Sequence, residues 1–424
     1  MESVPEEIVP EFTLLPVNQT CTEVWIEIQT KNISYPAKLV YAGIEAISDS
    51  VVVYSDTTLY FENLLPQTNY QLVSTLSEIQ SEEVLEDTLS FSTRDTTSHS
   101  FNWEISKFGG RNGSRLNDVF IFDENDIWAV GLIYDYNEPY LYNAVHWNGM
   151  TWEPKRIEVK LNNEMNLFEI WGIHAFNKND IWLSAGYPIK GNGVSWELID
   201  IWGMMEDTVA VRKMWGRNNN DLYGIGFAGK IVYYDGQNWL SKESGTEYIL
   251  NQIVGNETDI FVSGGNAAFH EGVVLKSTNH SAFSTFITGD FITEDELFGK
   301  LFGITSALWL DENDRLYTGS GLIYIYKNGR WDFLKTLSYN DLQTENINAH
   351  RGATISIGGA SSTDMWLVGD RNTIRHFNGS TWVQIGEPYA SNSDYMWFSV
   401  KQKGNVAVAV GLYGNQGTVI LMQR

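Results

Sequence analysis

The chain contains 424 residues, with 28 Lys and Arg against 53 Asp and Glu, which gives a formal net charge of −25. This negative charge argues against nucleic acid or an anionic membrane surface as a partner, because both would repel the protein. The single cysteine, Cys21, excludes an intrachain disulfide and a zinc site built from cysteines. No apolar run approaches the roughly 18 residues of a membrane-spanning helix.

The N-terminal quarter differs from the rest of the chain in charge and in pattern. Residues 1–100 carry 3 Lys or Arg and 16 Asp or Glu, a net charge of −13, which is about half of the total. We expect residues 1–10 to form a tail. Residues 11–95 are expected to form a small all-β domain, because short segments rich in β-branched and aromatic residues alternate there with turn residues. Residues 96–99 are polar and are expected to link this domain to the next.

One short phrase, NDIWAVG at Asn125–Gly131, organises residues 100–424. Its variants are NDIWLSAG at 179–186, NDLYGIG at 220–226, TDIFVSG at 258–264, NDRLYTG at 313–319, TDMWLVG at 363–369 and GNVAVAVG at 404–411. The Asp residues of successive clear copies are 38 to 55 residues apart, and a four-stranded propeller blade takes about 40–50 residues. The repeat therefore predicts a β-propeller.

A second phrase indicates a hairpin in most repeats. It joins an Asn-Gly or Asp-Gly turn to a following Trp, as in HWNGMTW at His146–Trp152. We therefore expect four strands in each repeat and name them A to D in chain order. The seventh repeat ends before its D strand, and Ser100–Phe108 is similar to the D strands of other repeats. We therefore predict a seven-bladed propeller over residues 100–424, with residues 100–108 completing the last blade. Six or eight blades remain open, because His270–Gly303 could hide a blade or lack one.

The first domain resembles a fibronectin type III domain. Leu64–Tyr70, with the sequence LLPQTNY, matches the corner before the penultimate strand of that family, where the Tyr hydroxyl bonds back to the backbone. Trp25 and Tyr41 match the core aromatic residues of the family. The resemblance implies an all-β chain with a fibronectin type III-like sandwich at residues 11–95, followed by the propeller.

Together, this domain and the repeats resemble a group of exported bacterial propeller proteins with NDIW-x-VG repeats. That group is mostly of unknown role, and some members carry the label glucosyl hydrolase. The resemblance implies a secreted or surface-anchored protein, such as a lipoprotein, outside the cytoplasm. The opening MESVPEEIVP has neither the basic nor the apolar part of a signal peptide, so we expect a leader not to be part of this chain.

Long loops on one face of the ring are the expected functional region. The A–B and C–D turns are short, whereas the B–C and D–A connections on the opposite face are long, and binding residues concentrate in such loops. We assign Gly131–Tyr142 and Gly186–Gly193 to B–C loops. Aromatic rings and carboxylates in these connections suit sugars or protein loops. The candidate ligand-binding residues are Tyr134, Asp135, Tyr136, Glu138, Tyr140, Tyr187, Tyr389 and Tyr395.

We therefore favour a non-catalytic binding or adhesion protein that binds a glycan or a protein on this face. A glycoside hydrolase with two acidic residues there and a structural subunit of an extracellular assembly stay open. Another interpretation is that the tyrosines have no role in binding and only pack their loops onto the neighbouring blades. We expect no cofactor, although acidic turns at Phe122–Asp126 and Leu310–Asp314 leave a calcium site open. His146 and His376 occupy equivalent positions and are expected to be structural.

Overall fold

The computed structural model describes residues 9–44, 47–79, 81, 83–110, 113–135, 141–204, 209–266, 271–289, 306–319, 323–327, 329–334, 353–385 and 394–424. The chain divides into two units, Met1–Ser98 with Asn378–Thr381 and His99–Phe377 with Trp382–Arg424. Within the described residues the protein is all-β apart from one short helix, α1 (Ile201–Met204). No helix there is long and apolar enough to cross a membrane.

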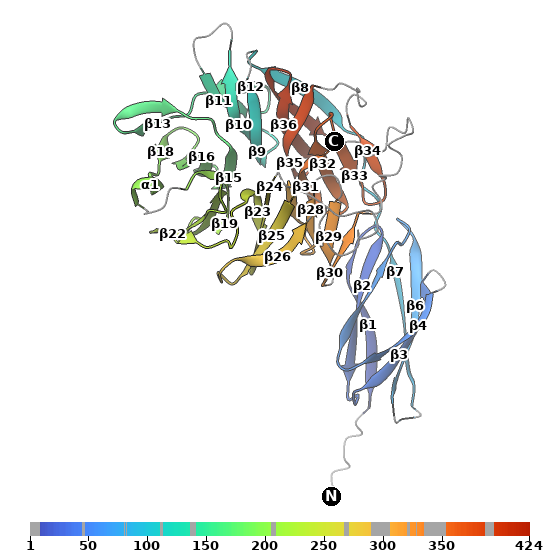
Figure 1. Cartoon of the computed structure of the whole chain (residues 1–424). Coiled ribbons are helices and arrows are strands. Elements are labelled where there is room, and N and C mark those ends of the chain that lie inside the picture. The colour runs from blue at the N-terminus through green and yellow to red at the C-terminus, as the bar shows by residue number, and fades with distance from the viewer. Residues whose placement is uncertain are drawn as a thin grey trace, which may run out of the picture. The chain divides into compact units, whose positions relative to one another are not determined.

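The first unit contains two antiparallel sheets around one core (Figure 1). The sheets have the orders β1-β2-β5 and β4-β3-β6-β7. Their strands are β1 (Glu11–Gln19), β2 (Glu23–Lys31), β5 (Thr57–Glu62), β4 (Ile47–Val53), β3 (Ala37–Ile44), β6 (Asn69–Glu78) and β7 (Leu85–Ser92). Side chains alternate between the two faces of a strand, so Val24, Ile26 and Ile28 of β2 enter the core, where Leu39 and Leu72 of the facing sheet meet them.

This alternation corrects one prediction and explains another. Trp25 was expected in the core, but its neighbours Val24 and Ile26 occupy that face of β2, so Trp25 lies on the other face against Tyr60, with ring centroids 5.0 Å apart. Tyr41 is partly buried and does pack against the core. The Tyr70 hydroxyl accepts a hydrogen bond of 2.8 Å from the Leu65 backbone N–H, which is the contact predicted from the corner sequence.

The second unit consists mainly of four-stranded antiparallel sheets, seven of them among the described residues. The first sheet contains β9 (Arg115–Asp123), β10 (Asp126–Tyr134), β11 (Leu141–Trp147) and β12 (Trp152–Lys155), and the second contains β15 (Gly172–Asn177), β16 (Asp180–Ala185), β17 (Tyr187–Gly191) and β18 (Trp196–Leu198). The third sheet contains β19 (Val211–Asn218), β20 (Asp221–Gly226), β21 (Ile231–Tyr234) and β22 (Trp239–Lys242). The fourth sheet contains β23 (Ile249–Gly255), β24 (Asp259–Asn266), β25 (Glu271–Thr278) and β26 (Ser284–Gly289). The fifth sheet contains β27 (Ala307–Leu310), β28 (Leu316–Gly319), β29 (Ile323–Lys327) and β30 (Arg330–Phe333). The sixth sheet contains β31 (Thr354–Ser361), β32 (Asp364–Gly369), β33 (Ile374–Phe377) and β34 (Trp382–Gln384). The seventh sheet contains β35 (Tyr395–Lys403), β36 (Val406–Tyr413), β37 (Gln416–Gln423) and β8 (Asn102–Phe108). A separate hairpin is formed by β13 (Glu158–Leu161) and β14 (Glu164–Leu167).

The sheets are arranged in a circle, as expected for a β-propeller (Figure 1). The first strand of each sheet contacts the first strand of the next, from β9 through β15, β19, β23, β27 and β31 to β35, and β35 contacts β9. The strand β8 pairs with β37 along its whole length, from Asn102 opposite Gln423 to Phe108 opposite Gly417. N-terminal and C-terminal segments of this unit therefore share one sheet.

The glycine that ends the repeated phrase has a steric role. In four copies, Gly131, Gly226, Gly369 and Gly411, an added Cβ would lie 1.9–2.1 Å from a backbone carbonyl oxygen at the start of the innermost strand or of the residue just before it. The pairing of that strand with its neighbour shifts register at the same place. Only glycine lets the two backbones approach so closely, which is why the phrase returns with this residue.

The Asp and aromatic residue of the phrase also recur as a structural group. The Asp contacts a residue of the third strand of the sheet, and that residue packs over the aromatic ring. The groups are Asp126–Trp128–His146, Asp180–Trp182–Lys190, Asp259–Phe261–Lys276 and Asp364–Trp366–His376. His146 and His376 are thus bound to Asp at 2.8 and 2.7 Å and serve the repeat, as predicted.

The second sheet corrects the predicted loop Gly186–Gly193. The strand β17 occupies Tyr187–Gly191, and the turn that follows is Asn192-Gly193, the hairpin signal of the other repeats. The B–C loop is therefore short, because NGVSW at 192–196 is a copy of the Asn-Gly-Trp phrase. In the first sheet, β10 ends at Tyr134 and β11 begins at Leu141, so the predicted loop Gly131–Tyr142 is also shorter than expected.

Candidate functional site

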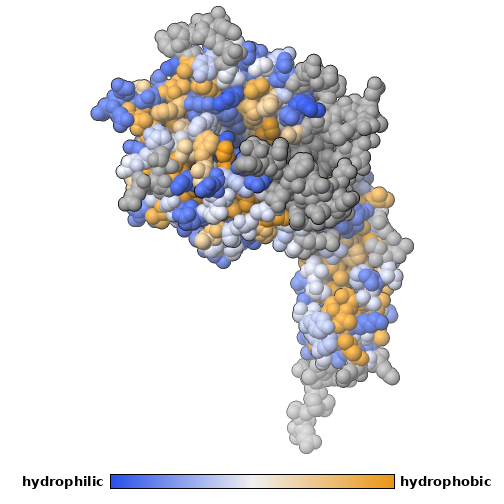
Figure 2. Space-filling model, in the orientation of Figure 1, coloured by the Kyte–Doolittle hydropathy of each residue, from blue (hydrophilic) through white to orange (hydrophobic). Residues whose placement is uncertain are grey.

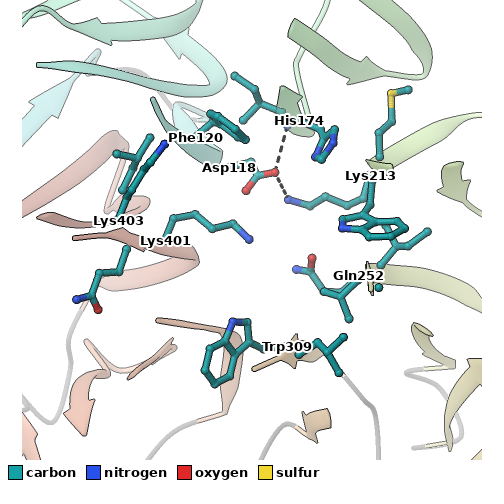
Figure 3. Close-up of a pocket in the computed structure, with 17 residues that line it drawn as sticks. Asp118, Phe120, His174, Lys213, Gln252, Trp309, Lys401 and Lys403 are labelled. Atoms are coloured by element: carbon teal, nitrogen blue, oxygen red, sulfur yellow. Dashed lines mark hydrogen bonds and ion pairs between the residues drawn. The ribbon is translucent and has the colours of Figure 1, made fainter. Parts of the chain in front are cut away.

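Two adjoining cavities lie inside the circle of innermost strands. The first has a volume of ≈ 400 Å³ and is lined by β9, β15, β19, β23, β27 and β35 (Figure 3). The second has a volume of ≈ 500 Å³ and lies where these strands begin, on the side of the B–C and D–A connections. Because Lys213 and Gln252 line both cavities, we call the pair the central channel and the second cavity its mouth.

Asp118 of β9 connects four sheets in the wall of the channel. Its carboxylate accepts hydrogen bonds from Ser399 Oγ at 2.7 Å and from the Ile173 backbone N–H at 3.1 Å, and it pairs with Lys213 Nζ at 2.7 Å. Burial alone would raise the pKa of Asp118, but Lys213 and Lys401 outweigh it and hold the pKa below its usual range. The carboxylate is therefore ionised at neutral pH and ties the blades together.

His174 of β15 also lines the first cavity (Figure 3). Burial, assisted by the charge of Lys401, lowers the pKa of His174 to about 4. The ring is therefore neutral at pH 7. Its Nε2 is buried and has no hydrogen-bond partner among the described residues. A neutral imidazole in this position is a poor general acid, but its Nε2 can donate or accept a hydrogen bond to a bound group, depending on the tautomer.

The mouth combines an ion pair with aromatic rings. The Arg115 guanidinium holds Glu169 through two hydrogen bonds of 2.7 and 2.8 Å, and Asn117 Nδ2 donates to the same carboxylate at 2.8 Å. Trp171 and Phe227 meet edge to face, with ring centroids 5.9 Å apart. Apolar rings beside a few fixed polar groups are typical of ligand-binding pockets.

Arg212 is the second arginine of the mouth. Its guanidinium carbon lies 4.9 Å from the centre of the Phe227 ring, and its Nη1 lies 3.5 Å from Asn251 Oδ1. Burial lowers the pKa of Arg212, although Glu169 opposes the shift. The guanidinium stays charged, because the usual pKa of arginine is so high, but it has lost part of its hydration.

The channel is positively charged, although the protein is strongly acidic. The charged residues that line it among the described residues are Arg115, Arg212, Lys213, Lys401 and Lys403, against Asp118 and Glu169. Their sum is 5 − 2 = +3, whereas the whole chain carries −25. Low-dielectric walls concentrate such a local field, so the channel attracts anions that the rest of the surface repels.

Of the predicted binding residues, the structure describes Tyr134, Asp135, Tyr187 and Tyr395, and none of these four lines the channel. Tyr134 ends β10, with its backbone held by Ser114 Oγ at 3.0 Å, and Asp135 follows it. Tyr187 begins β17 and packs against Trp202 at a centroid distance of 4.3 Å. Tyr395 begins β35 and packs against Tyr413 at 4.2 Å.

The predicted residues do not form one site in the described part of the chain. No ring contact, hydrogen bond or ion pair there joins Tyr134, Tyr187 and Tyr395 to one another. The other four candidates, Tyr136, Glu138, Tyr140 and Tyr389, lie outside the described residues. Their assignment to ligand binding stays a prediction.

In each of the two acidic turns considered for calcium, at least one carboxylate pairs with a cation. Lys178 Nζ lies 2.9 Å from Asp123 and 2.8 Å from Asp126 in the first acidic turn, and Arg315 pairs with Asp311 at 2.7 Å in the second. Within the described ranges, no group of three or more His, Cys, Asp or Glu side chains is placed to hold a metal ion. The single cysteine, Cys21, is buried, and burial raises the pKa of its thiol to about 11.

Comparison with known proteins supports the propeller. No protein-family model and no curated protein matches the sequence. The chain is similar in structure to YCF48 bound to D1 peptide, with a TM-score of 0.53 and 14% identity over 78% of this chain and 99% of that one. It is also similar to the WD40 β-propeller domain of Doa1, with a TM-score of 0.50 and 11% identity over 77% and 98% of the two chains. At these identities the likeness shows a β-propeller fold alone.

Proposed function

We propose that this is a non-catalytic binding protein whose channel mouth receives a segment of a protein partner. The observation that carries the proposal is the mouth itself, a cavity of ≈ 500 Å³ on the loop side of the ring that combines Trp171 and Phe227 with Arg212. A cavity of this size takes a few side chains of an extended segment rather than a folded domain. Aromatic residues and arginine are also the residues that contribute most to protein recognition.

A neighbouring structure gives this proposal independent support. In that structure, YCF48 is bound to D1 peptide. In this chain the mouth lies on the side of the B–C and D–A connections, and connections on a rigid scaffold are where binding residues concentrate. A protein segment is therefore the partner that we favour over the glycan considered from the sequence.

A glycan remains the second candidate, on a different part of the same unit. Tyr187 packs between Trp202 and Phe168, with ring centroids 4.3 and 6.1 Å away, and Trp202 is 37% exposed. An exposed aromatic platform suits the apolar face of a sugar ring. The hydrolase alternative gains no support from the channel, because Asp118 and Glu169 each bind a cation there.

Finer features of the fold belong to the same proposal. We read the seven sheets as seven blades closed by β8, and the first unit as a fibronectin type III-like domain because its Tyr70 contact and its two sheets match that family. An adhesion role and a place outside the cytoplasm rest on the family resemblance alone. Cell fractionation of the source organism would test the location.

A display library of random peptides, selected on the full chain, tests the binding proposal. Selected peptides should bind the wild-type protein and lose binding to the variant Ile355→Trp, because Ile355 lines the mouth and the larger ring would fill it. The matched control is Met150→Trp, which adds the same ring at an 80% exposed position in a C–D turn. If no peptide is enriched, or if both variants bind equally well, the proposal is wrong.

A further inference from the structure

We infer that the partner segment is acidic, and that Arg212 and Lys401 bind its carboxylates inside the channel. The inference rests on the proposed function, because it names the chemical class of the segment that enters the mouth. It follows from which channel cations already have a carboxylate and which do not.

Two of the channel cations are neutralised by the protein itself. Arg115 forms a bidentate pair with Glu169 at 2.7 and 2.8 Å, and Lys213 pairs with Asp118 at 2.7 Å. A third, Lys403, donates to the backbone oxygen of Phe122 at 2.9 Å near the opposite end of the first cavity. The contacts of these three cations stabilise the propeller itself, so we do not assign them to ligand binding.

Arg212 and Lys401 have no carboxylate in direct contact, although Glu169 acts on Arg212 and Lys401 acts on Asp118 from a greater distance. Among the described residues neither forms an ion pair within 4.0 Å, and the one hydrogen bond of the Arg212 side chain there goes to the neutral amide of Asn251 at 3.5 Å. Phe227 supports the guanidinium from one side at 4.9 Å, which leaves its planar donors available. A guanidinium held in this way binds a carboxylate through two parallel hydrogen bonds.

The two cations lie at successive depths along one path. Arg212 lines the mouth, and Lys401 lines the first cavity, which continues the mouth past Lys213 and Gln252. Figure 3 shows the Lys401 side chain pointing into that cavity, opposite Lys213 and above Trp309. A segment with more than one carboxylate could therefore meet Arg212 first and Lys401 further in.

The burial of Arg212 strengthens this preference. A partly buried cation has already lost water, so pairing with an anion costs less further desolvation than it would on an open surface. The chain as a whole is acidic, so an acidic segment gains nothing from the remaining surface and its binding is confined to the channel. A neutral segment would leave both cations without a carboxylate in direct contact.

Fluorescence anisotropy with two labelled peptides of equal length tests the inference on the full chain. One peptide is oligoglutamate, and the other is oligoglutamine, which has nearly the same shape without the charge. The wild-type protein should bind oligoglutamate at least about tenfold more tightly. Arg212→Gln and Lys401→Gln should each reduce that preference by about tenfold or abolish it. The control is Lys155→Gln, which removes one charge from the outermost strand β12.

The outcomes separate this inference from the proposed function. Equal affinity for the two peptides, or a preference that survives both substitutions, overturns the acidic segment while peptides from the display library still bind. Failure of every display peptide overturns the proposed function. Melting temperatures equal to that of the wild type identify the variants that are folded. Binding of neither labelled peptide also overturns the inference.

Discussion

Replacing Asp118 with Asn should destabilise the propeller more than the loss of an exposed ion pair does. The substitution keeps the shape of the side chain but removes its charge. Lys213, whose side chain is only 15% exposed, then has no carboxylate, and the new amide brings a donor toward the Lys213 ammonium group and the Ile173 N–H. Removing one partner of a buried pair costs about 3–5 kcal/mol. Because this pair faces a cavity, we expect about 2–4 kcal/mol.

Asp123→Asn is the matched control for this change. Asp123 lies on the same strand β9 and pairs with Lys178 of the next sheet at 2.9 Å, but the two side chains are 49% and 55% exposed. An exposed pair contributes about 0–1 kcal/mol, and salt screens it. Differential scanning calorimetry of the full chain should therefore show the melting temperature of the second unit lowered by roughly 3–6 °C in Asp118→Asn and nearly unchanged in Asp123→Asn. Equal melting temperatures for both variants would refute the idea that Asp118 ties the blades together.

Three further predictions concern stability. Gly411→Ala should cost about 3 kcal/mol or more, measured by denaturant unfolding, because the added Cβ would lie 1.9 Å from the Met396 carbonyl oxygen; a cost below about 1 kcal/mol would contradict the steric explanation of the repeat. Tyr70→Phe should cost the first unit about 1 kcal/mol, because the Leu65 N–H loses its acceptor, and an unchanged transition would show that this bond is not stabilising. Burial and the neighbouring His376 lower the pKa of His99 to about 4, below its value of about 6.5 in an unfolded chain. Folding therefore favours the neutral ring, so its contribution is complete above about pH 6.5 and is lost as the pH falls toward 4; the acid-induced drop in melting temperature should be smaller in His99→Phe, and an identical drop would contradict this.

The sequence predicts most of the propeller because the repeat records local geometry. Most copies of the phrase contain a turn Asp, an aromatic residue that packs in the sheet and a glycine that allows close approach of the neighbouring strand, as Asp126, Trp128 and Gly131 illustrate. The pairing of β8 with β37 could also be predicted, since a missing D strand and an extra one stand at the two ends of the repeats. Errors arose where the pattern was ambiguous, as with Trp25 on the outer face of β2 and Gly186–Gly193 at β17.

The channel could not be predicted, because its residues share no phrase. Asp118 and Lys213 belong to sheets that are not neighbours in the chain, and their 2.7 Å contact depends on how the innermost strands meet inside the circle. The basic residues Arg212 and Lys401 stand near the start of β19 and near the end of β35, so no common spacing marks them. One sequence feature could have indicated the channel. Basic residues occur in the strands that precede the repeated phrase, although the chain as a whole is acidic.

Figure 2 shows the hydropathy of one face of the second unit. Hydrophobic and hydrophilic residues are interspersed there over the described part of the second unit. The structural-subunit alternative requires a continuous apolar patch of several hundred Å², and that face does not display one among the described residues. The channel mouth is therefore the feature on which we base the function.

A crystal structure of the full chain with a peptide selected from the display library tests that central claim most directly. The account predicts the peptide in the mouth, in contact with Trp171 and Phe227 and with a carboxylate on Arg212. A peptide bound on the aromatic platform of Tyr187 and Trp202, or anywhere outside the channel, would contradict it.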